Sequence, residues 1–408
     1  MENVCRHFGP CGGCDWQDLA YDAQLRRKQH RLDDLLRSTL GKHAPTVAPT
    51  LGMRVDASGA PWGFRNKASF VFGEAPDRRG SVIGHYAMQS RTVVPITECP
   101  VHDPRANHIA FALHGHLSRA HVSAAGPMLR GVLRHLIIRT TRDGREAVAM
   151  LVVTRNEKSL RAPIRAFLGT ADAPDGFYLN IHDRPGPYMV GRETMRLAGR
   201  SHVRERVAGM SFLVSPTAFF QTNIEAAEAI VTLVLEAAGA LAPGSHVLDL
   251  YAGSGLFALP LAAKGHTVSA VEENVHAVRD ADANLRLNEL PGGAVRLYAS
   301  RVEDALRTMK REPFDLVVVD PPREGLPPPV VRHLFGRMAP PLAVYISCNP
   351  EALAAELPAI REHGYEILRV QPVDMFPHTT HIETVVVLRK VPKVPRVPKV
   401  QGAAPQAP

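Results

Sequence analysis

Hydrophobic positions in the second half of the chain alternate between two spacings. Short apolar runs rich in Val, Ile and Leu are followed by stretches in which apolar residues recur every three or four positions. The first pattern is typical of strands buried in a parallel sheet, and the second of helices packed on one side. The expected strands, each followed by a helix, are 246–250, 267–272, 295–299, 314–319 and 342–347. Strands 365–373 and 384–388 follow without a helix between them, so the pattern predicts a doubly wound α/β sheet ending in an antiparallel hairpin.

The first half of the chain has more strands than helices. Leucines on one helical face predict a docked helix over 18–40, and a loop rich in Gly and Pro follows over 41–63. Helices are also expected over 107–120 and 160–168. The expected strands are 68–72, 81–86, 91–96, 133–140, 146–154, 177–182 and 210–214. This content predicts a mixed α+β domain with an antiparallel sheet.

The change of pattern near residue 215 predicts the domain boundaries. We expect an α+β domain over 1–215 and an α/β domain over 216–390. A basic, proline-rich tail over 391–408 is predicted to be disordered. Thr222 and Glu225 have the spacing of a capping box, which predicts the start of the first helix of the second domain.

Composition is that of an ordinary globular protein, with 45% hydrophobic and 22% charged residues in 408. No apolar run approaches the roughly 18 residues that a spanning helix needs, and the N-terminus lacks the features of a secretory signal. We therefore expect a cytoplasmic monomer with no membrane partner. In that compartment thiols stay reduced, so the five cysteines are expected to be ligands or nucleophiles rather than disulfides.

Charge is distributed unevenly along the chain. Residues 1–215 hold 30 Lys and Arg against 19 Asp and Glu, whereas residues 216–389 hold 14 against 21. The basic half is nearly all arginine, whose planar guanidinium suits phosphates and stacks on bases. Nucleic acid is the natural partner of such a surface. The alternative is a solvated face on an arginine-rich protein.

Four cysteines suggest a metal centre. Cys5, Cys11 and Cys14 have the spacing C-x5-C-x2-C, and Cys99 is the remaining cysteine outside the strand that ends at Cys348. Four thiolates suit an iron–sulfur cluster or tetrahedral zinc. A single CxxC pair favours the cluster, while His7 and His102 could replace cysteines in a zinc site.

A glycine loop follows the first strand of the second half. Asp249-Leu-Tyr251-Ala-Gly253-Ser-Gly255 lacks the third glycine of the dinucleotide fingerprint and has the form that S-adenosylmethionine enzymes use. Glu272 ends the next strand, where a carboxylate can accept hydrogen bonds from both ribose hydroxyls. Together these residues predict a nucleoside cofactor.

Two further strands of the sheet end in reactive groups. Asp320 precedes two prolines and Arg323, and Cys348 follows the apolar run 342–347. Because carboxyl ends of parallel strands bind ligands, Cys348 is a candidate nucleophile, although a free cysteine is more commonly a small buried hydrophobe. Asp-Pro-Pro is related to the loop of amino-directed methyltransferases, but Arg323 replaces the aromatic residue that would stack on a base.

These motifs resemble the RNA uracil-5-methyltransferase family, specifically its iron–sulfur branch acting on 23S ribosomal RNA. The resemblance extends to Lys390 and includes Phe-Arg-Asn-Lys at 64–67, Phe-Phe-Gln-Thr-Asn at 219–223, Ser-Cys-Asn-Pro at 347–350 and His-Ile-Glu-Thr at 381–384. The small β-barrel module of longer members is not seen before the cysteines. The resemblance implies a Rossmann-like methyltransferase domain.

Site residues follow from the same resemblance. It implies a [4Fe–4S] cluster on Cys5, Cys11, Cys14 and Cys99. It implies S-adenosylmethionine held by Gln221, Tyr251, Glu272 and Asp320. It also implies Cys348 as nucleophile and Glu383 as base.

The chemistry of uracil agrees with this set of residues. Thiolate addition at C6 makes C5 nucleophilic, and a base must later remove the C5 proton. The target uridine is expected to be flipped, with Arg65 and Lys67 as candidate phosphate contacts. The alternatives are a tRNA uracil-5-methyltransferase, an amino-directed methyltransferase in which Cys348 only packs, and a non-catalytic RNA-binding iron–sulfur protein.

Overall fold

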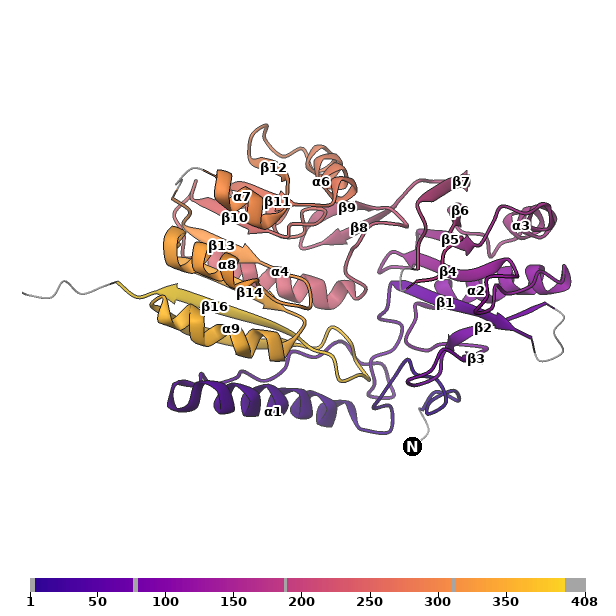
Figure 1. Cartoon of the computed structure of the whole chain (residues 1–408), viewed down its shortest axis with the longest axis horizontal. Helices are drawn as coiled ribbons and strands as arrows, with labels where there is room; N and C mark the ends of the chain where they lie inside the picture. The colour runs from indigo at the N-terminus through magenta and orange to yellow at the C-terminus, as the bar shows by residue number, and fades with distance from the viewer. Residues whose placement is uncertain (1–3, 76–79, 187–188, 310–312, 393–408) are drawn as a thin grey trace, which may run out of the picture.

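The computed structural model describes residues 4–75, 80–186, 189–309 and 313–392, and it contains two large sheets side by side (Figure 1). The predicted tail falls almost entirely outside the described residues. No helix in the described part is long and apolar enough to cross a membrane.

The first sheet has the strand order β3-β2-β1-β4-β5-β6-β7. Its pairs are antiparallel except β5 with β6, which are parallel because α3 connects them. Helices α2 and α3 pack on one face of this sheet and share its apolar core. The elements are β1 Lys67–Glu74, β2 Ser81–Tyr86, β3 Val93–Pro95, α2 Pro104–Arg119, β4 Leu133–Thr140, β5 Ala147–Val153, η2 Lys158–Leu160, α3 Arg161–Leu168, β6 Gly176–Ile181 and β7 Glu193–Gly199.

The second sheet has the strand order β12-β11-β10-β13-β14-β16-β15. It is parallel from β12 to β14, and β16 pairs antiparallel with both β14 and β15. The predicted doubly wound sheet with a terminal antiparallel hairpin is therefore confirmed. Its elements are α4 Ile224–Ala238, β10 His246–Leu250, α5 Ala258–Ala263, β11 Thr267–Glu272, α6 Val275–Leu287, β12 Val295–Ala299, α7 Val302–Thr308, β13 Leu316–Val319, α8 Pro328–Val331, the π-helical turn η3 Arg332–Met338, β14 Leu342–Ser347, α9 Pro350–Glu362, β15 Tyr365–Val373 and β16 Glu383–Lys390.

Helix α1, Tyr21–Leu40, packs with the second sheet although it precedes the first sheet in sequence. Its buried Leu32, Leu36 and Leu40 belong to the apolar cluster on one face of the second sheet. After the short helix η1, Gly41–His43, the chain pairs with β15 through the bridges Val47 to Val370 and Leu51 to Val373. The N-terminal segment therefore spans both halves of the molecule. The predicted boundary at residue 215 stays a prediction.

Helix α4 starts one residue later than the capping box predicted. Its N-cap is Asn223, whose side chain accepts a hydrogen bond from Ala226 N. The Thr222 hydroxyl is buried without a partner among the described residues, and Glu225 accepts from Arg54 N instead. The capping-box prediction is wrong because asparagine, an equally strong cap, directly follows the threonine.

Two strands were not predicted, namely β7 at the edge of the first sheet and β8 after it. Strand β7 is largely exposed and polar, so it has no apolar alternation. Strand β8, Val203–Val207, forms a separate two-stranded ribbon with β9, Met210–Val214. Edge strands and isolated ribbons carry weak hydrophobic patterns because only part of their surface is covered.

Candidate active site and metal centre

Topology brings the nucleophile and base predicted from the sequence to one edge of the second sheet. Cys348 directly follows β14, and Glu383 is the first residue of β16. These strands pair antiparallel, with Ser347 opposite Thr384. Cys348 follows Ser347 and Glu383 precedes Thr384, so Cys348 and Glu383 lie beside each other. Asp320 follows β13, the other neighbour of β14. The three acidic groups therefore share the carboxyl edge of the parallel strands.

The three groups also affect one another electrostatically. Burial raises the pKa of the Cys348 thiol to about 11, with further increases from the charges of Glu383 and Asp320 and an opposing effect from Arg323. Burial also raises the pKa of Asp320 to about 7 and the pKa of Glu383 well above its ordinary value. Adjacent acids resist ionising together. A cationic ligand would favour ionisation of this pocket.

Arg323 supplies a positive charge that opposes the pKa increases of Cys348 and Glu383. Its replacement in Arg323→Gln is expected to raise the pKa of Cys348 further, because the nearby cation favours the thiolate. Alkylation of Cys348 by iodoacetamide at pH 8, followed by peptide mass spectrometry, should slow about two- to fivefold. Replacing the exposed Arg332 on η3 with glutamine is the matched control and should leave the rate unchanged. Faster alkylation in Arg323→Gln would contradict this account of the pocket.

The glycine loop after β10 has the geometry of a close ligand approach. Tyr251, Gly253 and Gly255 all have positive φ, at 64°, 55° and 92°. The Glu272 carboxylate accepts hydrogen bonds from Gly253 N at 3.0 Å and Asn274 N at 2.7 Å, which joins the end of β11 to the loop. A side chain at position 255 would meet Leu259 at 2.2 Å, so glycine is needed there. Tyr251 and Glu272 thus lie at the same turn.

Asp249, inside β10, was noted in the sequence only as the start of the glycine motif. It is fully buried, and among the described residues no donor meets strict hydrogen-bond geometry with its carboxylate, although the Ala258 backbone N–H is near enough to lower its pKa slightly. Burial and the charge of Asp320 raise its pKa well above the ordinary value. A buried acid that lacks a well-formed hydrogen bond, beside a glycine loop, fits a site built for a polar, positively charged ligand. S-adenosylmethionine, which carries a sulfonium charge, meets that requirement.

Gln221 lies in the segment that leads from β9 to α4 and is half-buried. This segment is hydrogen bonded to the chain on both sides of it. Thr222 O accepts from Asn66 N at 2.7 Å, and Asn223 donates to Met375 O at 3.1 Å. Gln221 therefore stands between the first sheet and the loop that precedes Glu383.

The other four cysteines line a single cavity of about 450 Å³. Cys5, Cys11 and Cys14 come from the N-terminal segment, and Cys99 from the loop before α2. Burial raises the pKa of Cys14 to about 11 and of Cys99 to about 12, and the cysteines also raise one another's pKa values. The structure thus places Cys99 on the same cavity as the three N-terminal cysteines. The sequence suggested this grouping only because Cys99 was the remaining cysteine.

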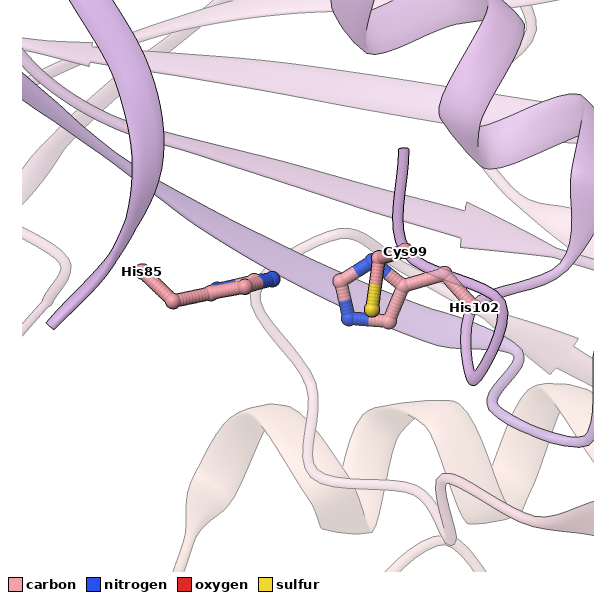
Figure 2. Close-up of side chains that lie close together, drawn as sticks. All are labelled: His85, Cys99 and His102. Carbon is pink, nitrogen blue, oxygen red and sulfur yellow. The ribbon is translucent and has the colours of Figure 1, made fainter. Parts of the chain in front are cut away.

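A second group of ligand types includes one of these cysteines. Atoms of His85, Cys99 and His102 that could bind a metal lie within 4.8 Å of one another, and Figure 2 shows the His85 ring directed toward the other two. Nε2 of His85 and Nδ1 of His102 are buried without hydrogen-bond partners in the described chain. His7, the other proposed zinc ligand, instead accepts a hydrogen bond from Thr97 N. His85 was missed because a lone histidine in a strand carries no metal signature.

Positively charged side chains lie around the cavity. Arg65 and Lys67 line it, Arg65 Nε is buried without a partner in the described residues, and burial lowers the pKa of Lys67 to about 8. Burial lowers the pKa of both His85 and His102, and the nearby charge of Arg65 lowers both further. Zinc bound by four thiolates and an iron–sulfur cluster bound by four thiolates both carry net negative charge, which nearby cations favour. The residues present therefore fit a thiolate-ligated metal centre of either kind.

The parallel sheet, the glycine loop after its first strand and the acid ending its second strand define a Rossmann-like, S-adenosylmethionine-dependent methyltransferase. A family model described as tRNA (Uracil-5-)-methyltransferase matches residues 192–391. Uncharacterised RNA methyltransferases of Gloeobacter violaceus and Synechocystis are each 34% identical, covering 96% and 93% of this chain and 83% and 81% of theirs. The chain belongs to the RNA uracil-5-methyltransferase family.

A solved structure shares the whole architecture. The tRNA (uracil-54, C5)-methyltransferase of Pyrococcus abyssi, crystallised with S-adenosyl-L-homocysteine, is 28% identical with a TM-score of 0.74. The match covers 95% of this chain and 88% of that one. The family prediction and the prediction of a methyltransferase are therefore confirmed. The iron–sulfur branch, the RNA target and the individual site residues stay predictions.

Proposed function

We propose that this enzyme transfers a methyl group from S-adenosylmethionine to C5 of a specific uridine in 23S ribosomal RNA. The observation that carries the proposal is the juxtaposition of Cys348 and Glu383 across the β14 and β16 pair. A nucleophile and a base at one sheet edge are the two groups that alkylation of a pyrimidine carbon requires. An amino-directed enzyme would need neither.

Each protein group has a defined task in this reaction. Cys348 adds to C6 as the thiolate, and the electrons of the C5–C6 double bond move toward O4 and make C5 nucleophilic. Once C5 carries both the methyl group and its original proton, Glu383 removes that proton. The double bond then re-forms and the Cys348 thiolate leaves, so the enzyme is regenerated once Glu383 releases the proton.

Gln221, Tyr251, Glu272 and Asp320 are proposed to hold S-adenosylmethionine. Glu272 is placed at the glycine loop, where its carboxylate can also meet ribose hydroxyls. Burial raises the pKa values of Asp320 and Asp249, and a sulfonium bound beside them would favour their ionised forms. The bound cofactor supplies an electrophilic methyl group.

The choice of ribosomal RNA rests on the motifs shared with the iron–sulfur branch. A tRNA target is the second candidate, because the Pyrococcus abyssi relative is a tRNA (uracil-54, C5)-methyltransferase. Comparing 5-methyluridine in 23S RNA and tRNA from wild-type and gene-deleted cells distinguishes them. Loss of the modification from one 23S position supports the proposal, and loss only from tRNA overturns the choice of substrate. We further propose that the enzyme acts as a monomer in the cytoplasm, where ribosomal RNA is located.

Cys5, Cys11, Cys14 and Cys99 are proposed to bind a [4Fe–4S] cluster with a structural role, because methyl transfer to C5 needs no electron. Anaerobically purified protein is expected to contain about four iron and four sulfide per chain. Cys99→Ser should lose most of that iron, as measured by elemental analysis. His85→Ala is the matched control and should keep it. Stoichiometric zinc that disappears in His85→Ala would instead identify the histidine-containing group as the metal site.

A further inference from the structure

The loop 374–382, here called the base loop, connects β15 to β16 and ends at Glu383. We infer that the N-terminal segment 15–31 positions this loop for proton removal, with Gln24 as the principal positioning residue. The inference rests on the proposed role of Glu383. It adds a function for a segment that contains none of the proposed catalytic, cofactor-binding or cluster-binding residues.

His378, in the middle of the base loop, is in contact through its backbone N–H, its carbonyl and its ring. Its backbone N–H donates to Gln24 Oε1 at 2.9 Å, and its carbonyl accepts from Asp15 N at 2.8 Å and Trp16 N at 3.0 Å. The ring is within hydrogen-bond distance of Pro61 O and stacks on Trp62 at 4.3 Å. His378 has a positive φ of 64°, a conformation that costs energy for a non-glycine residue and persists when its surroundings enforce it.

Gln24 joins the N-terminal segment to the base loop with one side chain. The side chain is buried, and its Nε2 donates to Trp16 O at 2.9 Å and Leu19 O at 2.8 Å while its Oε1 holds His378. The glutamine amide both donates and accepts hydrogen bonds. An apolar or charged side chain of similar length would not make all of these bonds. Removing it would leave buried backbone groups unpaired and free the base loop at its centre.

Further bonds occur at every second position of the base loop. Lys28 donates to Asp374 at 2.5 Å and to Phe376 O at 3.0 Å, and both charged side chains are buried. Thr380 N donates to Asp15, and Arg31 donates to Thr380 O at 3.2 Å. Residues 374, 376, 378 and 380 are therefore all bonded to segment 15–31. The base loop takes its shape from this segment.

The same segment is continuous with the cysteine cavity. Cys14 immediately precedes Asp15, and Phe376 of the base loop lines the cavity beside Cys14 and Cys99. Figure 1 shows α1 lying along the face of the second half near α9 and β16. The cysteine site thus fixes one end of the segment that holds the base loop. A metal centre bound by these cysteines would therefore be linked to the base loop through segment 15–31.

Gln24→Leu in the full-length, iron-loaded enzyme tests the inference with 23S RNA as substrate. Steady-state methylation should fall about ten- to hundredfold, because small misplacement of a catalytic group is costly. The covalent protein–RNA adduct, seen on a denaturing gel, should accumulate, since Cys348 still adds but the C5 proton is not removed. Gln29→Leu is the matched control on the same helix, since Gln29 bonds Val47 O rather than the base loop. Gln29→Leu should show wild-type turnover and a wild-type amount of protein–RNA adduct.

A second variant covers the possibility that Gln24→Leu does not fold. Asp15→Ala removes the exposed side chain that accepts from Thr380 N and should show the same adduct accumulation with a smaller loss of turnover. The inference is overturned if these variants turn over normally, or if adduct and turnover decline together. The proposed function itself fails if Cys348→Ala methylates RNA in the same assay. The two failures are therefore distinguishable.

Discussion

Cys348→Ala is expected to lower methylation of RNA by about 10⁴-fold or more, the scale on which loss of a covalent nucleophile acts. C5 of uracil does not attack a sulfonium without prior addition at C6, and the other four cysteines line a different cavity. The measurement is transfer of labelled methyl groups from S-adenosylmethionine to the RNA substrate. No protein–RNA adduct should form.

A neighbouring substitution controls for damage to the strand end. Ser347→Ala removes a hydroxyl that donates to Asn349 O, and it should keep activity within a few-fold of wild type. Cys348 itself is half-buried at the end of β14, so its loss should leave the fold intact. Wild-type methylation by Cys348→Ala would exclude covalent catalysis and favour a cysteine that only packs.

Glu383→Gln is expected to reduce turnover by about 10²- to 10⁴-fold, the range attributed to a positioned general base. Glutamine preserves the shape of the buried side chain but cannot take the C5 proton, so the methylated adduct should accumulate on Cys348. The measurements are steady-state turnover and the adduct fraction on a denaturing gel. Free release of methylated RNA at the wild-type rate would contradict the role of Glu383.

The pH dependence offers a second readout of the same group. Burial and the charge of Asp320 raise the pKa of Glu383 well above its ordinary value. Because the base acts as the carboxylate, wild-type turnover should fall as pH decreases through this raised pKa. The Glu383→Gln variant should lack the part of this decrease that Glu383 causes, so its turnover should depend less steeply on pH, with only the Cys348 thiol still losing its thiolate as pH falls. Glu366→Gln, on the exposed face of β15, should retain the wild-type pH dependence.

Much of the second sheet could be predicted from the sequence because its strands are short, apolar and regularly separated by helices. Cys348 and Asp320 follow such strands, so their common edge follows from parallel pairing alone. The position of Glu383 beside Cys348 could not be predicted from parallel pairing. It depends on the antiparallel insertion of β16 between β14 and β15, which an apolar run does not specify.

Other features depend on contacts that leave no local pattern. Gln24 and His378 are 354 positions apart, and a glutamine on a helix usually indicates a solvated face. The packing of α1 on the second sheet is equally remote, because leucine spacing reveals an apolar face but not its partner. His85 joined Cys99 and His102 only once β2 and the loop before α2 were brought together.

The placement of α1 has a consequence for synthesis on the ribosome. Leu32, Leu36 and Leu40 leave the exit tunnel early, but they pack in a cluster that includes Val386 and Leu388 of β16, the last strand described. Until those residues are translated, the helix has no finished surface to cover, and its leucines stay available to chaperones or to unwanted association. Helix α1 and strand β16 therefore complete their packing at the same time. A nascent chain interrupted before β16 would be left with an exposed amphipathic helix.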